Sequence, residues 1–362
     1  MDQWLKNWFH VKVSRRRSAS APLIKVSRVL VVGKFPNPTF DYYFAARLSA
    51  PGMPPFQLLD IRSFDSNTVE ADGTFVILIR YASKAAARWL GENRARLAGV
   101  AVFLDDDIAA LVLGREASLG YRYRLMRDSI LPLRTLRGMI DELWVSTETL
   151  ARRHSYADPT ILPPAPSLAT LPVAAQAVTQ DACPLQTVTL AYHATAIHVE
   201  EHRFLAPIIR QVLQLRKHAE FEVFAEGRSA KLWLGLDLDR VMVRRPLPWQ
   251  KYVEENCHRS VDIMVVPVAP SQVNDCRAET KRIDIARLKA AAILSDCPAF
   301  QTAEEGEILL AYDEVLWVRQ LISLIDDPQA RINAALATRR RVEALARESA
   351  AGIPSIRNLG AS

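Results

Sequence analysis

Two basic side chains and one carboxylate lie close together between residues 262 and 296. Arg277, Lys281 and Asp284 follow an apolar run, DIMVVPV, and a polar loop that contains Asn274; a second apolar run, AAAILSD, comes after them. Cations suit phosphate groups, and a carboxylate suits sugar hydroxyls. This combination predicts a nucleotide-sugar site.

The segment that carries these residues reads as a strand, a loop, a helix bearing all three charges, and another strand. Such a unit builds a parallel sheet, and α/β folds bind ligands beyond the carboxyl ends of the strands. The same alternation runs along most of the chain and predicts a doubly wound parallel architecture. The expected strands are 26–33, FQLLDI, 74–81, 100–107, the start of 141–154, 187–193, 221–227, 240–246 and 262–268; the main expected helices are 200–218, 249–257 and 314–349.

A proline-rich stretch at residues 157–184 interrupts the alternation, which then begins again. A change of composition of this kind is typical of an interdomain linker. We expect two Rossmann-like halves of ordinary domain size. The predicted parts are a basic aromatic N-terminal segment, 1–23; an N-terminal domain, 24–165; a C-terminal domain, 166–330; and a C-terminal helix, 331–362, that packs back on the N-terminal domain.

The composition is that of a folded globular protein, with 24% charged and 49% hydrophobic residues. The net charge of +6 is compatible with anionic lipid or a phosphorylated substrate, but it is too small to indicate nucleic acid. None of the four cysteines forms a CxxC pair, which fits a reducing, cytoplasmic location. The sequence shows neither a membrane-spanning run nor a secretory signal.

The N-terminal residues combine aromatic and basic side chains. Trp4, Leu5, Trp8 and Phe9 have helical spacing, and the run Arg15–Arg17 comes after them. Such an amphipathic segment can lie on an anionic membrane surface, here through residues 1–20, which predicts a peripheral position on the inner face of the inner membrane. The alternative is a frayed tail or a helix that packs on the body of the protein.

Three segments together resemble the GT-B glycosyltransferases of the family 4-like, bacterial group. They are DELWVSTETLARRH, AYHATAIHVEEHRFLAPIIRQVL, and the stretch from residue 262 to 296. The order and spacing of these segments make the match specific, although each motif alone is weak. The resemblance implies two Rossmann-like domains, an α/β fold with a deep interdomain cleft, and a nucleotide-sugar donor held by the second domain.

Position by position, the resemblance places Asn274, Arg277, Lys281 and Asp284 on the donor motif. It implies catalytic roles for the last three: the cations stabilise the leaving diphosphate, and the carboxylate orients the donor. The chain departs from the pattern at two neutral positions, with Ala194 for glycine and Ala278 for serine, and Asp284 stands for glutamate. The alternatives are a solvated basic helix face and, for Asp284, a salt bridge to Lys281, Arg287 or Lys289.

Further donor contacts are expected where the second domain begins. The segment at residues 193–201 is predicted to present backbone N–H groups and polar side chains to a diphosphate. The alternative for its threonine and second histidine is a helix-capping role. The predicted donor-binding residues are His193, Thr195, His198, Glu201, Asn274 and Tyr252.

The acceptor is expected to meet the first domain. Gly33, Lys34 and Arg80 come after two predicted strands, and Asp105, Asp106 and Asp107 come after a third. The three acids are expected to face the cleft. A rival interpretation is the Asp-x-Asp metal site of GT-A glycosyltransferases, and the alternative for the acids is an acidic helix start. We prefer GT-B, because it accounts for the second half of the chain; this predicts no metal.

The glycine pattern of a dinucleotide site, GxGxxG, is absent from the first strand–helix loop, so no cofactor beyond the nucleotide-sugar co-substrate is expected. The predicted activity is transfer of a hexose-type sugar, with retention and without metal, to a glycan or lipid-linked acceptor in polysaccharide or glycoconjugate synthesis. Two alternatives remain: a catalytically weak GT-B-like protein that binds a glycan or nucleotide, and a nucleotide-sugar epimerase.

Overall fold

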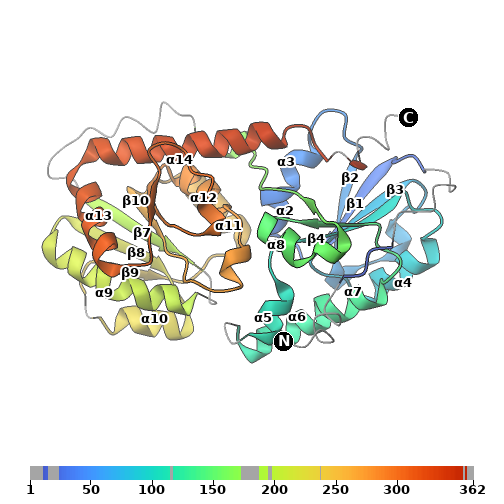
Figure 1. The fold of residues 1–362 in the computed structure, drawn as a ribbon, viewed down its shortest axis with the longest axis horizontal. Helices are drawn as coiled ribbons and strands as arrows, with labels where there is room; N and C mark the ends of the chain where they lie inside the picture. Colours follow the sequence, from blue (N-terminus) through green and yellow to red (C-terminus); the bar gives the residue numbers. More distant parts are fainter. Residues whose placement is uncertain are drawn as a thin grey trace. The chain divides into compact units, whose positions relative to one another are not determined.

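A computed structural model describes residues 11–14, 24–114, 117–172, 187–194, 198–236, 238–353 and 355–356. The chain forms two compact units. Unit 1 comprises Met1–Pro166, Cys276–Ala278 and Arg347–Ser362, and unit 2 comprises Ser167–Asp275 and Glu279–Ala346. Each unit is an α/β layer structure built on a parallel sheet of six strands (Figure 1).

The sheet of unit 1 has the strand order β2-β1-β3-β4-β5-β6. Its central strands are buried along their whole length, which explains why they read as uninterrupted apolar runs. The strands are β1 (Arg28–Gly33), β2 (Phe56–Asp60), β3 (Thr74–Ile79), β4 (Gly99–Leu104), β5 (Glu142–Val145) and β6 (Thr160–Ile161).

Helices cover both faces of this sheet. Alternate residues of β1, Val29 and Val31, join a core with Phe40 and Phe44, and Ile353 from the end of the chain belongs to the same core. The helices are α2 (Pro38–Tyr43), α3 (Ala45–Leu48), α4 (Lys84–Asn93), α5 (Ile108–Leu113), α6 (Leu119–Leu125), the π-helical η3 (Met126–Ile130), α7 (Leu131–Thr135) and α8 (Glu148–Arg153); short 3₁₀ turns are η1 (Ile61–Ser63), η2 (Ser66–Thr68) and η4 (Ser155–Ala157).

The sheet of unit 2 has the order β12-β11-β10-β7-β8-β9. Its strands are β7 (Val188–His193), β8 (Ala219–Phe224), β9 (Val241–Arg244), β10 (Ile263–Val266), β11 (Ala291–Ser295) and β12 (Ile308–Leu310). The helices are α9 (Val199–Leu215), α10 (Gly227–Leu234), α11 (Trp249–Cys257), α12 (Lys281–Leu288), α13 (Glu314–Asp326) and α14 (Pro328–Ser349); short turns are η5 (Leu168–Thr170), η7 (Asn274–Cys276) and η8 (Pro298–Phe300).

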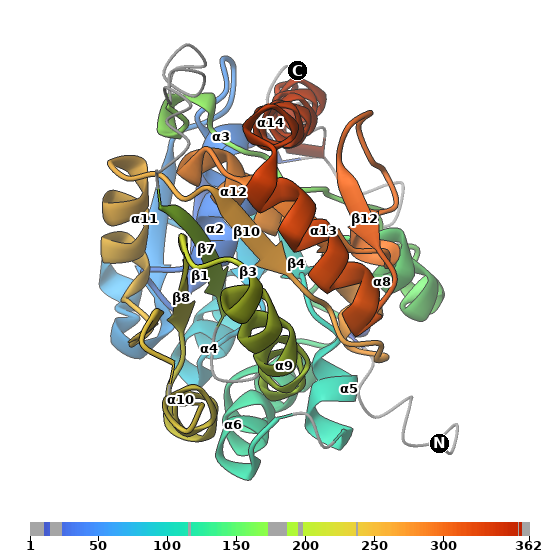
Figure 2. The same ribbon diagram turned by 90° about the vertical axis from the view of Figure 1, so that its left-hand side faces the viewer.

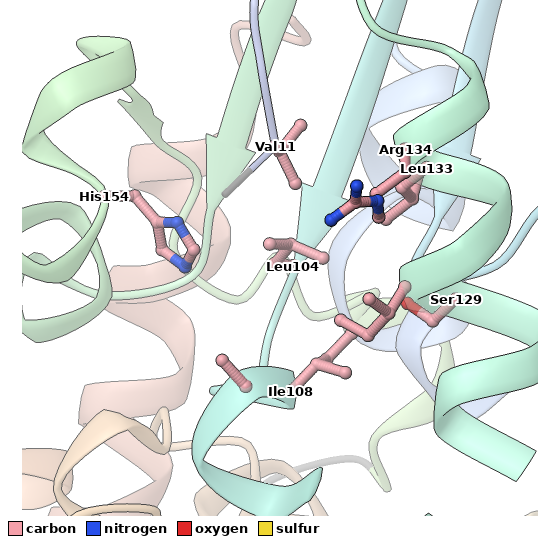
Figure 3. A pocket seen from close by; sticks show the side chains of 9 residues that line it. Val11, Leu104, Ile108, Ser129, Leu133, Arg134 and His154 are labelled. Carbon is pink, nitrogen blue, oxygen red and sulfur yellow. The ribbon is translucent and has the colours of Figure 1, made fainter. Parts of the chain in front are cut away.

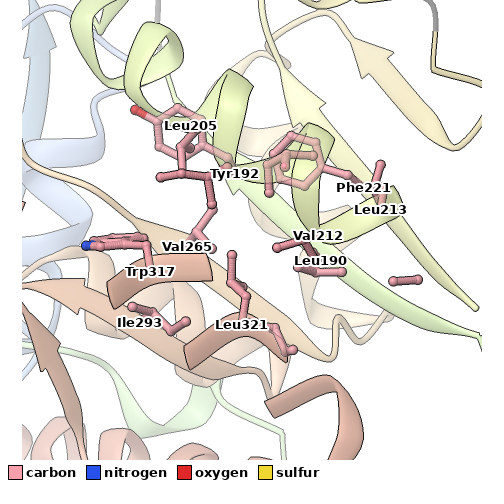
Figure 4. Close-up of a cluster of buried hydrophobic side chains, with 14 of the residues drawn as sticks. Leu190, Tyr192, Leu205, Val212, Leu213, Phe221, Val265, Ile293, Trp317 and Leu321 are labelled. Atoms are coloured by element: carbon pink, nitrogen blue, oxygen red, sulfur yellow. The ribbon is translucent and has the colours of Figure 1, made fainter. Parts of the chain in front are cut away.

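The main core of unit 2 lies between its sheet and the helices α9, α10 and α13. Leu190, Val265 and Ile293 come from three neighbouring strands and meet Val212 of α9 and Trp317 of α13 (Figure 4). Helices α9 and α13 lie side by side on this face (Figure 2). The other face packs against α12 through a second core that includes Ile285 and Leu288.

The expected alternation of strands and helices is confirmed, and both sheets are parallel throughout the strand pairs observed. One local prediction was wrong: the helix was expected to carry Arg277, but α12 begins at Lys281. The preceding residues form the turn η7, in which Asn274 is fixed by side-chain hydrogen bonds, so the helix starts later. Thr147 caps α8, accepting a hydrogen bond from the N–H of Leu150.

Candidate functional site at two strand edges

In each sheet the chain first adds strands on one side of the first strand and then returns to add the remaining strands on its other side. We call the place between these two sets of strands the reversal point. In unit 2 the reversal falls between β7 and β10, and in unit 1 it falls between β1 and β3. Ligands of open α/β sheets bind in the crevice beyond the carboxyl ends of the strands at such a point. The loops after these four strands are therefore the candidate site in each unit, and most of the predicted residues lie on or beside them.

The loop after β10 is tied to the first turn of α9. The Asn274 amide donates hydrogen bonds to Glu201 Oε1 at 3.1 Å and to the carbonyl of Ala269 at 2.8 Å. His198 Nδ1 lies 3.4 Å from the same Glu201 oxygen. Glu201 and Asn274 are buried. The structure thus brings together three of the predicted donor residues, with the two buried side chains holding the loop in shape.

The ring of His193, at the end of β7, is engaged on both nitrogens. Nε2 lies 2.9 Å from Glu222 Oε1, and Nδ1 lies 3.2 Å from the hydroxyl of Tyr252. Burial lowers the pKa of His193, although the Glu222 carboxylate opposes this, and burial raises the pKa of Tyr252 well above its ordinary value. A neutral ring that donates from Nε2 and accepts the tyrosine O–H satisfies both bonds, so these side chains position the strand end.

Glu222 is the centre of a charge network that sequence reasoning missed. Its carboxylate accepts hydrogen bonds from Arg244 at 3.1 Å and from Arg259 at 2.6 Å, and both arginines also bond to Glu255. Burial alone would raise the pKa of Glu222, but the bonds from His193 and Arg259 outweigh it and lower the pKa to about 2. The available signal was the second glutamate of the strand AEFEVF, which lies between apolar residues, because a buried charge needs partners.

Lys281 lies in the first turn of α12 and reaches the end of β7. Its Nζ donates to the backbone carbonyl of His193 at 3.1 Å and lies 3.5 Å from Asp284 Oδ2. The Lys281 side chain is 38% exposed, in contrast to that of Asp284, which is 1% exposed. A partly solvated ammonium group at the reversal point can bind an anion without leaving its own carboxylate partner.

The side chain of Asp284, in α12, is buried. Its Oδ1 accepts a hydrogen bond from Arg287 at 3.0 Å, and its Oδ2 faces Lys281. These are two of the salt-bridge partners considered from the sequence. Beyond Lys281 the helix has no solvated face, because every residue from Arg282 to Leu288 is buried. Arg282, with no exposed side-chain surface, is bonded to Glu279 and Glu307 instead.

Three further positions of the predicted donor region have different surroundings. Arg277 is partly buried and belongs to the short segment, Cys276–Ala278, that groups with unit 1. Thr195 lies outside the described residues. Ala194, the residue that stands for the family's glycine, is buried in the main core of unit 2.

The reversal point of unit 1 carries Gly33 and Lys34 after β1. Lys34 Nζ lies 4.3 Å from the centroid of the Tyr81 ring and donates to Asp128 Oδ2 at 2.7 Å. A side chain at Gly33 would meet Asn37 at 3.2 Å. Lys34 is 31% exposed at its side chain, so this strand edge also presents a partly solvated cation.

Arg80, after β3, is held by the acids that come after β4. Its guanidinium bonds to both carboxylate oxygens of Asp105 and lies 3.0 Å from Asp106 Oδ2. Thr39 donates a further hydrogen bond to Asp105 at 2.8 Å. The backbone of Arg80 has a φ of 59°, a left-handed conformation that residues other than glycine rarely adopt, and such backbone strain is common at functional positions.

The three consecutive acids have separate roles. Asp105 is buried against Arg80, whereas Asp107 caps α5 by accepting from the N–H of Ala110 at 2.8 Å and pairs with Arg153. The acidic helix start considered as an alternative therefore holds for Asp107. Burial raises the pKa of Asp106, an effect that Arg80 opposes and Asp105 reinforces.

Within the described residues, no group of three or more histidine, cysteine or acidic side chains is arranged to hold a metal ion. In that same part of the chain, no helix combines the length and the apolar character needed to cross a bilayer. Most of the N-terminal segment predicted to bind a membrane, including Trp4 and Trp8, lies outside the described residues.

No family model matches the sequence, and no curated protein matches it. Solved structures do resemble the fold. Sucrose-phosphate synthase from Thermosynechococcus elongatus has a TM-score of 0.62 at 13% identity, over 92% of this chain and 98% of that one. An α,α-trehalose 6-phosphate synthase from Burkholderia multivorans has a TM-score of 0.54 at 11% identity, over 92% and 96%.

A third similar structure is TarM from S. aureus, crystallised with fondaparinux, α-GlcNAc-glycerol and UDP. Its TM-score is 0.53 at 9% identity, over 83% of this chain and 58% of that one. At identities this low the likeness establishes the fold, two Rossmann-like α/β domains of the GT-B type. The predicted fold class is confirmed, and a GT-A fold, on which the Asp-x-Asp interpretation depended, is excluded.

Proposed function

We propose that the chain is a glycosyltransferase that moves a sugar from a nucleotide-diphosphate sugar to a hydroxyl acceptor. The observation that carries this proposal is the position of Lys281. Its ammonium group is partly solvated and lies 3.1 Å from the carbonyl that ends β7, at the reversal point of the unit 2 sheet. The GT-B fold supports it, because structures with this fold include two sugar-phosphate synthases and a protein bound to UDP.

In this proposal unit 2 binds the donor. Lys281 binds the diphosphate, because an ammonium group forms strong charge-assisted hydrogen bonds to phosphate oxygens. The loop that Asn274 and Glu201 hold together faces the sugar or the phosphates, with His198 beside it. His193 and Tyr252 act through position: they fix the strand end whose carbonyl contacts Lys281.

The proposed step is transfer at the anomeric carbon, with retention of configuration. The acceptor oxygen forms a bond to that carbon, the bond from the carbon to the diphosphate oxygen breaks, and the acceptor proton passes to the leaving phosphate. Negative charge grows on the diphosphate as the bond breaks, and fixed cations stabilise it. The cations serve this purpose without a metal in the mechanism proposed here.

Unit 1 supplies the acceptor contacts in this scheme. Asp105 and Asp107 are almost fully buried, whereas the side chains of Asp106 and Lys34 are 19% and 31% exposed, so Asp106 and Lys34 are the charged groups best suited to acceptor hydroxyls. A glycan or lipid-linked sugar of a bacterial polysaccharide or glycoconjugate fits this assignment. Residues 1–20 remain a predicted attachment to the inner face of the cytoplasmic membrane.

Titration calorimetry with UDP, GDP and ADP tests the donor assignment. For the diphosphate that binds, Lys281→Met is expected to weaken the affinity roughly 10-fold to 100-fold, the size of a lost charge-assisted bond. Lys289→Met removes the same charge at the other end of α12 and is the matched control. Equal affinities for the wild type and Lys281→Met, or an equal loss in both variants, contradict the assignment.

A second candidate is a GT-B protein that binds a nucleotide or glycan without transfer. Asp284 favours it, because the carboxylate expected to orient the donor is buried between Lys281 and Arg287. A screen of nucleotide sugars for transfer and hydrolysis separates the two candidates. Diphosphate binding that depends on Lys281, with no turnover of any donor, would favour the binding protein.

A further inference from the structure

A surface of unit 1, outside the residues assigned to either strand edge, combines exposed apolar and basic side chains. It lies on α5 and on the continuous helical run α6–η3–α7, from Leu119 to Thr135. Leu119 is 78% exposed and Tyr123 is 66% exposed, values that are high for large apolar side chains. We call this surface the basic apolar face; it consists of Leu113, Leu119, Tyr123, Arg124, Arg127 and Leu131.

The helical geometry brings four of these side chains close to one line, those of Leu119, Tyr123, Arg127 and Leu131. Residues four apart are neighbours on a helix, which pairs Leu119 with Tyr123 and Arg127 with Leu131. The segment Met126–Ile130 between the two pairs is a π-helix, which holds more residues per turn and shifts the register of the α7 residues after it. Tyr123 and Leu131 thereby come closer to one line than they would in an unbroken α-helix.

The charge of this region has one sign. Residues 117–140 contain five arginines and a single acid, Asp128, which is already engaged by Lys34 and Arg127. Arg127 remains 57% exposed at its side chain, and Arg124 lies over the Tyr121 ring at 5.7 Å. The five arginines are Arg122, Arg124, Arg127, Arg134 and Arg137.

The N-terminal part of the chain joins the structure beside the same helices. Val11 lines a pocket of about 20 Å³ together with Ile108 of α5 and Leu133 of α7 (Figure 3). Two residues later, Val13 forms a parallel bridge with Ile140. The segment at residues 11–14 is thus fixed against the helices that carry the basic apolar face.

We propose that the basic apolar face docks on an anionic lipid surface. Its leucines and tyrosine enter the interfacial layer of the bilayer, and its arginines meet phosphate headgroups. Nucleic acid fits less well, because Tyr123 is the one aromatic residue of this face, which therefore offers few rings for bases to stack on. A second copy of the chain also fits less well, because self-pairing would bring arginines against arginines.

Flotation of the full chain with vesicles tests this. One set of vesicles is phosphatidylcholine alone, and the other is phosphatidylcholine mixed with an equal part of phosphatidylglycerol. The wild type is expected to float with the mixed vesicles only. Leu119→Ser with Leu131→Ser, and separately Arg124→Gln with Arg127→Gln, should each weaken binding roughly tenfold or more, since each group contributes interfacial area or headgroup attraction.

Matched controls change the same residue types elsewhere. Leu215→Ser with Leu234→Ser alters two exposed leucines of unit 2, which are 51% and 69% exposed. Arg152→Gln with Arg203→Gln alters two exposed arginines that pair with glutamates. These variants should float as the wild type does. Circular dichroism verifies that all variants are folded, as expected for exposed positions.

Three results would overturn the proposal. The first is unchanged flotation of both face variants, which would leave residues 1–20 as the sole lipid contact. The second is RNA binding, measured by fluorescence anisotropy, that is lost in the arginine variant while vesicle binding persists. The third is a dimer in sedimentation velocity that the leucine variant converts to monomer, which would assign the face to a second copy. None of these readouts depends on nucleotide binding, so they leave the proposed sugar transfer untouched.

Discussion

The strand edges of the two units each contain a cluster of three charged side chains, and the signs of the charges are opposite in the two clusters. In unit 1 the guanidinium group of Arg80 lies between two carboxylates, those of Asp105 and Asp106. In unit 2 the buried carboxylate of Asp284 lies between two cations, Lys281 and Arg287. A cluster with more acids than cations suits neutral or hydroxyl-bearing ligands, and a cluster with more cations than acids suits a diphosphate. The proposed division of donor and acceptor between the units rests on this electrostatic difference.

Both edges also contain charges that serve the fold. Each has one buried ion that hydrogen bonds from several directions, Asp105 in unit 1 and Glu222 in unit 2, and one lysine that stays partly solvated. Breaking a buried pair leaves an uncompensated charge, whereas losing a solvated lysine costs little. Stability and ligand binding should therefore respond to different residues at each edge.

The largest effect on stability is expected for Arg80→Met. This change leaves Asp105 and Asp106 together without their cation, and we expect a loss of about 3–5 kcal/mol in the free energy of unfolding near neutral pH. Because burial already raises the pKa of Asp106, the folded state binds a proton more readily than the unfolded chain. The deficit should shrink as the pH falls from about 8 to about 5, since protonation relieves the repulsion. Urea unfolding at several pH values measures this, and a deficit that grows on acidification would contradict it.

A smaller loss is expected for Glu222→Gln in unit 2. The pKa of Glu222 in the fold is about 2, below its ordinary value of 4.5, so the carboxylate stabilises the folded state wherever it is ionised in both states. We expect the variant to lose about 2–3 kcal/mol at neutral pH. The difference from the wild type should vanish as the pH falls from 4.5 to about 2. Asp326→Asn, which removes the partner of Arg216 at the surface, is the control and should change stability by less than about 1 kcal/mol.

The smallest effects on stability are expected for the two lysines, which should differ instead in their effect on nucleotide binding. Lys34→Met and Lys281→Met are each expected to change the free energy of unfolding by less than about 1 kcal/mol, because both side chains are partly solvated. Nucleotide diphosphate affinity should fall only for Lys281→Met. If Lys34→Met lowers that affinity equally, the division of donor and acceptor between the two edges is wrong.

The strands were predictable because buried parallel strands leave long apolar runs in the sequence. The runs at 74–81 and 262–268 contain β3 and β10, each buried at every position. The Thr147 cap was predictable for a similar reason, since a capping hydroxyl acts within three residues of its own position. The start of α12 was not predictable, because it depends on contacts that Asn274 makes with Glu201, 73 residues away.

The site residues show the same division. The sequence indicated which residues stand at strand ends, and the structure places His193, Lys34 and Arg80 there. It did not indicate which side chains remain accessible. Lys281 and Arg282 are adjacent and both basic, but one is 38% exposed and the other is not exposed at all. Of the acids that pair with Arg282, Glu279 lies only three residues before it, whereas Glu307 lies 25 residues after it and is brought into contact by the fold.

The sequence alone thus determined the succession of buried strands and the helices between them, because burial and local hydrogen bonding act over a few residues. The tertiary structure decided which charges are paired. Glu222 finds His193 at a separation of 29 residues and Arg259 at 37, and Asp105 finds Thr39 at 66. Such pairs form because parallel strands bring distant carboxyl ends to one edge, where a low dielectric makes each unpaired charge costly.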